Sequence, residues 1–120
     1  MSRLTLCTLL VGLAALPFVG TAAAAPAKLT GSVGPGYTIG LKVGSKKATK
    51  LKAGVAYRLT VTDRSDEHDF RLVGPGVNRA VTGAEFVGRK SIVVRFRAGT
   101  YRFFCAPHAD EMRGSFRAAR

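Results

Sequence analysis

The chain has few cysteines, histidines and acidic residues. Its 120 residues include two cysteines, two histidines and seven Asp or Glu residues. Cys7 lies near the N-terminus, so Cys105 has no cysteine partner in the rest of the chain. A protein that loses its N-terminal segment can therefore form no intramolecular disulfide. Its single thiol must be reactive, bridge two molecules or bind a metal.

No apolar run predicts a membrane-spanning helix. The uncharged stretch over residues 4–19 is interrupted by Pro17, and a spanning helix needs about 20 apolar residues. A positive residue precedes the stretch and small residues follow it, which is typical of a secretory signal peptide rather than an uncleaved anchor. We predict a signal peptide over residues 1–25, cleaved between residues 24 and 27, and one domain over residues 28–120. This predicts a location in the periplasm, outside the cell or in the cell envelope.

The charge balance is strongly basic. The chain has nineteen Lys and Arg residues and seven acidic residues, which gives a formal net charge of +12. Such a charge can indicate nucleic-acid binding, but the predicted export argues against it. The simpler interpretation is a solvated surface in a compartment bounded by anionic surfaces. The alternative is a monomer that its charge steers toward an acidic partner or an anionic envelope surface. Four lysines are expected to form an exposed basic loop: Lys46, Lys47, Lys50 and Lys52.

The rest of the chain alternates apolar and polar residues in short segments between glycine-containing turns, which is typical of β-strands. The alternation places five groups of side chains on shared faces. They are Tyr37, Ile39, Leu41 and Val43; Tyr57, Leu59 and Val61; His68, Phe70 and Leu72; Ile92, Val94 and Phe96; and Tyr101, Phe103 and Cys105. Five arginines fall on outward positions: Arg58, Arg71, Arg95, Arg97 and Arg102. With a short closing strand over residues 114–117, the pattern predicts an all-β fold, a two-sheet antiparallel sandwich.

A candidate metal site follows the last long strand. His108 comes three residues after Cys105, and Met112 four residues later. His68 begins an inward strand face, so it can reach the same end of a sandwich. Two imidazoles and a thiolate with a weak axial thioether form the ligand set of a blue-copper electron-transfer site.

Each candidate also has a simpler interpretation. A lone buried cysteine is usually an apolar core residue, Met112 could fill core volume, and either histidine could serve a turn or a loop. Zinc is the competing metal, but it prefers four strong N, S or O ligands over a thioether. The combination of one cysteine, both histidines and a methionine favours copper.

The segment over residues 99–108, followed by Met112, resembles the copper loop of the cupredoxins, a family of blue-copper proteins. It is similar to the plastocyanin, pseudoazurin and amicyanin group. Residues 67–72 resemble the strand that carries the first histidine ligand of that family. The Cys-x-x-His-x-x-x-Met spacing with an upstream histidine gives the resemblance its specificity, and the similarity extends over most of residues 28–117.

The resemblance implies a Greek-key sandwich with equatorial ligands His68, Cys105 and His108 and axial Met112. Two features depart from the family. The loop between His108 and Met112 is shorter than in plastocyanins and longer than in amicyanins. Asp69 also stands where many members have an asparagine that ties the ligand loops together, and a carboxylate there needs a hydrogen-bond donor.

We therefore expect an exported protein with one type 1 copper per chain that carries single electrons by Cu(I)/Cu(II) cycling. It would meet a transient redox partner at the exposed edge of His108. A copper storage or delivery protein is the alternative, and a metal-free structural sandwich is a third possibility. We expect no enzyme, because a catalytic copper centre needs more histidines than the two already assigned.

Overall fold

The computed structural model describes residues 12, 14–20 and 24–120. Residues 12, 14–20 and 24–26 have no regular secondary structure, and the rest of the predicted signal peptide lies outside the described residues. The elements are β1 (Ala27–Val33), β2 (Ile39–Val43), β3 (Lys46–Lys47), β4 (Lys50–Lys52), β5 (Ala56–Asp63), β6 (Phe70–Gly74), β7 (Val77–Thr82), β8 (Gly88–Arg95), β9 (Gly99–Phe104), η1 (Ala106–His108) and β10 (Arg113–Ala119). Within these residues, no helix has the length and apolar character needed to cross a bilayer.

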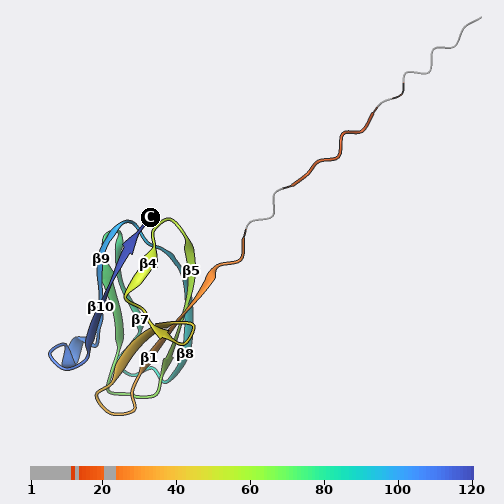
Figure 1. Cartoon of the computed structure of the whole chain (residues 1–120). Helices are drawn as coiled ribbons and strands as arrows, with labels where there is room; N and C mark the ends of the chain where they lie inside the picture. The colour runs from red at the N-terminus through yellow and green to blue at the C-terminus, as the bar shows by residue number, and fades with distance from the viewer. Residues whose placement is uncertain (1–11, 13, 21–23) are drawn as a thin grey trace, which may run out of the picture.

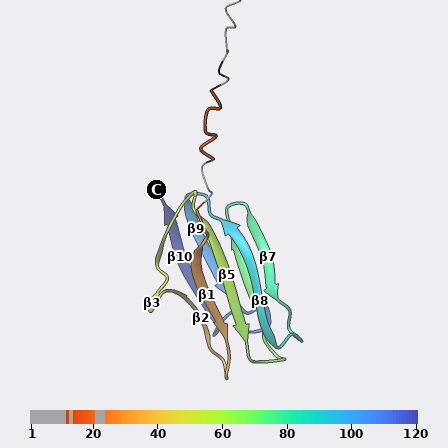
Figure 2. The same ribbon diagram turned by 90° about the vertical axis from the view of Figure 1, so that its right-hand side faces the viewer.

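The strands form two facing sheets of five strands each. Sheet A has the order β3-β2-β1-β5-β8, and sheet B has the order β4-β10-β9-β6-β7. Figure 1 shows the two layers, and in Figure 2 sheet A faces the viewer. The predicted two-sheet sandwich is confirmed. The sheets are mixed, because β1 pairs with β5 and β4 with β10 in parallel while the other pairs among the described strands are antiparallel.

The core lies between the sheets and follows the predicted alternation in most strands. Side chains that the pattern placed inward are buried on β5, β6 and β9. The largest are aromatic: Tyr101 stacks on Phe116 with ring centroids 5.2 Å apart, and Phe70 stacks on Phe103 at 5.7 Å. Burial of these apolar surfaces is the main force that holds the two layers together.

Two local predictions are wrong. Tyr37 does not continue the inward face of β2, which begins at Ile39; its side chain is 57% exposed. The lysine segment is not a single loop, because β3 joins the edge of sheet A and β4 joins the edge of sheet B. Ala48 between them is buried, so the chain crosses from one sheet to the other there. All four lysines are nevertheless exposed, as expected.

Four loops meet at one end of the sandwich, which we call the ligand pole. They cover residues 34–38, 64–69, 83–87 and 105–112. The strand register brings them together, since Asp63 pairs with both Val33 and Gly88 in sheet A. In sheet B, Phe70 pairs with Thr82 at the same end. Figure 1 shows η1 at this pole and the C-terminus at the opposite end.

Candidate metal centre

His68 is held at the ligand pole by the start of β6. It lies two residues before Phe70, whose side chain is fully buried, and its own side chain is only 2% exposed. The alternation that buries Phe70 and Leu72 therefore carries His68 inward as well. A buried imidazole needs polar partners, and the side chains of the neighbouring loop supply them.

The loop that follows β9 brings the other candidate residues to the same place. Cys105 is fully buried at the end of β9, and Pro107 favours the short helix η1 that follows it. The N–H of His108 donates to the carbonyl of Cys105 at 3.1 Å, and the N–H of Met112 donates to the carbonyl of His108 at 2.8 Å. The N–H of Cys105 donates to the carbonyl of Met112 at 3.0 Å, which closes the loop.

Three side chains converge at the centre of this loop. The Nδ1 atoms of His68 and His108 lie 3.0 Å apart, and they lie 3.8 Å and 3.6 Å from Cys105 Sγ. A point equidistant from these three atoms is about 2.0 Å from each, close to the length of a metal–imidazole bond. The triangle is therefore the right size for one metal ion bound by all three side chains.

Met112 belongs to the same loop, but it is not one of the three residues whose side-chain atoms form this triangle. Its side chain is fully buried, and its backbone is fixed on both sides by the hydrogen bonds to Cys105 and His108. His108 is half-buried, whereas His68 and Cys105 are buried. Of the three clustered residues, His108 is thus the one that reaches the surface.

Asp69 connects the segment of His68 to the loop that contains Cys105 and His108. Its Oδ1 accepts a hydrogen bond from the N–H of Ala106 at 2.6 Å, and its own N–H donates to Cys105 Sγ at 3.5 Å. Its Oδ2 forms an ion pair with Arg71 Nε at 3.3 Å. The donors that a carboxylate needs at this position are therefore present.

The thiol of Cys105 is fully buried. Burial raises the pKa of the Cys105 thiol, and the nearby carboxylate of Asp69 acts in the same direction. Hydrogen bonds from the backbone N–H groups of Asp69 and His108 oppose this rise in the pKa. A metal that binds the thiolate must displace the proton, so metal binding and deprotonation of Cys105 are coupled.

Tyr37 covers the histidine pair from the loop between β1 and β2. Its ring centroid lies 4.8 Å from that of His108, edge to face, and 5.3 Å from that of His68. The alternating pattern gave no signal for this role, because it placed Tyr37 in a strand, on the same face as Ile39. Its position beside the glycine-rich segment Gly34-Pro35-Gly36 could have indicated a loop instead.

The fold is found in solved structures of rusticyanin, although no family model and no curated protein matches the chain by sequence. Reduced rusticyanin has a TM-score of 0.57 and 22% identity, over 76% of this chain and 77% of that one. Rusticyanin from Thiobacillus ferrooxidans has a TM-score of 0.55 and 22% identity, over 76% and 75%. The chain has the cupredoxin fold. The sandwich expected from the sequence resemblance is thereby supported by a separate comparison of structures.

The donor set of this cupredoxin-like domain fits a type 1 copper ion better than zinc. Among the described residues, His68, Cys105 and His108 form a group of three clustered His, Cys, Asp or Glu ligands. A structural zinc site has four such ligands in a tetrahedron. Two imidazoles and one thiolate in a trigonal arrangement are the strong ligands of a blue-copper site.

Proposed function

We propose that the protein is an exported mononuclear blue-copper protein that carries single electrons. The convergence of two imidazole Nδ1 atoms and one buried thiol on a point about 2.0 Å from each carries this proposal. The cupredoxin fold and the copper protein rusticyanin among its structural neighbours support it. When bound, the copper ion would supply a Cu(I)/Cu(II) couple.

In this proposal His68, Cys105 and His108 would hold the copper ion, and Met112 would supply a weaker thioether donor. The thiolate of Cys105 would hold the metal most strongly, and the buried side chain of Met112 would approach it from the loop closed by the Cys105–Met112 hydrogen bond. Ligands fixed by two sheets and a hydrogen-bonded loop change position little between oxidation states. Rapid electron transfer depends on such a small rearrangement.

The protein's own residues would also control access to the site. His68 and Cys105 are buried and would exclude water, whereas half-buried His108 would provide the contact with a redox partner. Carriers of this kind form small, transient complexes. The net charge of +12 favours a partner with an acidic surface. The protein would act as a monomer in the periplasm, outside the cell or in the cell envelope after loss of residues 1–25.

A copper titration followed by visible spectroscopy tests the proposal. We expect an intense blue band that saturates at one copper per chain and is bleached by ascorbate. The Cys105→Ser variant should lose the band, because the colour comes from the bond between copper and the thiolate. The Ser115→Ala variant is a matched control, since Ser115 lies on the exposed face of β10.

The alternative outcomes separate the competing functions. A blue band that cannot be cycled by reductant and oxidant would indicate copper storage or delivery rather than electron transfer. Preferential binding of zinc, with no blue band after copper addition, would refute the type 1 assignment. A band that persists in Cys105→Ser would show that the ligands are elsewhere.

A further inference from the structure

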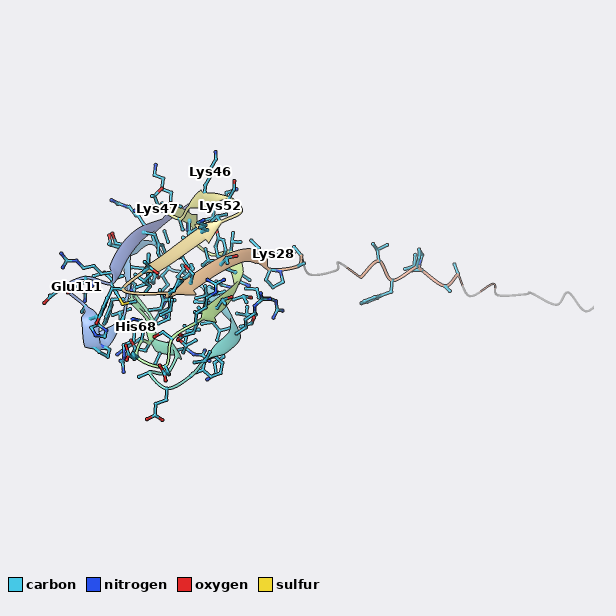
Figure 3. The ribbon with its side chains drawn as sticks, turned by 90° about the horizontal axis from the view of Figure 1, so that it is seen from below. Lys28, Lys46, Lys47, Lys52, His68 and Glu111 are labelled. Atoms are coloured by element: carbon cyan, nitrogen blue, oxygen red, sulfur yellow. The ribbon has the colours of Figure 1, made fainter. Side chains whose placement is uncertain are left out.

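The exposed charges of the protein are largely separated by sign, although the exposed cation Arg64 lies in a loop at the ligand pole. All of its exposed Asp and Glu side chains lie in loops at the ligand pole: Asp66, Glu67, Glu85, Asp110 and Glu111. Figure 3, viewed from this pole, shows Glu111 on the loop over residues 105–112, which we call the ligand loop, and Lys46, Lys47 and Lys52 grouped away from His68. An acidic partner that approached the pole directly would meet five carboxylates of its own sign, despite the positive net charge of the molecule.

The outer face of sheet B carries the opposite charge. Six cationic residues point outward from its strands: Lys50, Lys52, Arg71, Arg102, Arg113 and Arg117. No carboxylate occupies an outward position on the strands of this sheet that the structure describes. Arg117 and Lys50 are even paired directly across β10 and β4, an arrangement that destabilises a sheet.

A groove connects this cationic face to the ligand loop. It has a volume of about 540 Å³ and lies between β9, β10 and the loop, lined by Arg102, Phe104, Ala109, Asp110, Arg113 and Ser115. Arg113 pairs with Phe104 and Ser115 with Arg102, so the two arginines stand diagonally on one face. The guanidinium of Arg102 lies 5.8 Å from the centroid of the Phe104 ring. One wall of the groove is thus part of the loop that carries His108.

We propose that this groove, which we call the flank groove, docks an acidic segment of the protein's redox partner. The proposal rests on the proposed function and names the surface through which the partner binds. Carboxylates of the partner would pair with Arg102 and Arg113, and an apolar side chain would cover the half-buried ring of Phe104. Both guanidinium groups can form bidentate hydrogen bonds with carboxylates. The bound segment would lie against the ligand loop and would stay away from most of the carboxylates at the ligand pole.

Two other cationic surfaces make poorer docking sites for electron transfer. The outer face of sheet A also carries cations, among them Arg58 and Arg89, but none of its residues lines the groove beside the ligand loop. A groove of about 300 Å³ lined by Arg95, Arg97 and Arg120 lies at the end opposite the ligand pole. A partner seated there would be separated from the candidate metal centre by the length of the sandwich.

Binding of a fluorescein-labelled hexaglutamate peptide, measured by anisotropy at low and moderate salt, tests the proposal. The double variant Arg102→Ser/Arg113→Ser should weaken binding about tenfold, or about 1.4 kcal/mol, because it removes two exposed ion pairs with the peptide. The control Arg58→Ser/Arg89→Ser removes the same charge from sheet A and should change the affinity by less than about twofold. Asp110→Asn should strengthen binding, since it removes the carboxylate that lines the flank groove.

Equal weakening by both double variants would overturn the proposal, because it would show that net charge alone attracts the peptide. Vesicles of equal parts phosphatidylglycerol and phosphatidylcholine provide the second arm. If they bind through Arg102 and Arg113 while hexaglutamate does not, the flank groove serves a membrane and the proposal is wrong. The blue band is recorded for every variant. Absence of the band from the unsubstituted protein refutes the copper function. If the protein is blue but Arg102→Ser/Arg113→Ser binds the peptide as well as the unsubstituted protein does, only the flank groove proposal is refuted.

Discussion

The carboxylate of Asp69 accepts a hydrogen bond from the backbone N–H of Ala106 at 2.6 Å. This contact joins the segment that carries His68 to the segment that carries Cys105 and His108. The backbone N–H of Asp69 reaches Cys105 Sγ, and its second oxygen pairs with Arg71. One residue therefore positions the ligand loop and brings a negative charge close to the candidate metal, with a guanidinium that partly balances it.

Substitution of Asp69 separates these two effects. Asp69→Asn keeps an oxygen for the Ala106 N–H but removes the charge, so we expect a higher midpoint potential, because Cu(II) loses an electrostatic stabilisation relative to Cu(I). Asp69→Ala leaves the N–H of Ala106 without its partner and should lower the free energy of unfolding by about 1–3 kcal/mol. Voltammetry and denaturant unfolding measure the two quantities.

Asp66→Asn is the matched control for the charge effect. Asp66 lies in the same loop, but its side chain is exposed to solvent, where water and salt screen its charge. We expect a smaller shift in potential than for Asp69→Asn. Equal shifts for the two variants would mean that the short Asp69–Ala106 contact gives the carboxylate no special influence on the site.

Tyr37 should protect the candidate metal from solvent. Its ring packs against both imidazoles, so we expect Tyr37→Ala to accelerate copper loss to a chelator severalfold. Because the side chain is 57% exposed, the free energy of unfolding should change by only about 0.5 kcal/mol. Tyr37→Phe retains the ring and should lose copper at the original rate. Slow loss from Tyr37→Ala would show that other groups shield the histidines.

Met112→Leu tests the proposed axial ligand. Leucine has a similar volume, so the fully buried site should lose less than about 1.5 kcal/mol of stability. Loss of a thioether donor should raise the midpoint potential and leave the blue band in place, because the axial ligand tunes the potential of such sites. An unchanged potential would mean that Met112 only fills the core beneath the loop.

The sequence predicted the architecture because strand alternation is a local property. The inward residues of β5, β6 and β9 could be read directly, since each strand needs one apolar face toward the core. The parallel pairing of β1 with β5 could not be read in this way. Pairing partners depend on how the whole chain is connected, and alternation is the same in parallel and antiparallel strands.

At the candidate metal centre, spacing indicated which residues could meet but not how they are held. The separation of Cys105, His108 and Met112 marked the loop, and His68 was placed at the same end by its strand. The contacts of Tyr37 with both imidazoles and of Asp69 with Ala106 join loops that are far apart in the sequence. No periodicity records such contacts, so they became visible only in the folded chain.

The aromatic core beneath the ligand loop depends on a glycine. Gly114 pairs with Phe103 across β9 and β10, and a Cβ atom at Gly114 would overlap the Phe103 ring. That ring stacks on Phe70, two residues after His68. We therefore expect Gly114→Ala to displace both rings and lower the free energy of unfolding by about 1–3 kcal/mol.

Gly83→Ala is the control, because a Cβ atom there has no neighbour within 4 Å, and the stability should change by only about 0.5 kcal/mol. Thermal and denaturant unfolding of the two variants give the comparison. Since Phe70 and Phe103 support the strands that carry His68 and Cys105, Gly114→Ala should also shift the blue band. A normal band in a destabilised Gly114→Ala protein would mean that the metal centre is insulated from the core packing beneath it.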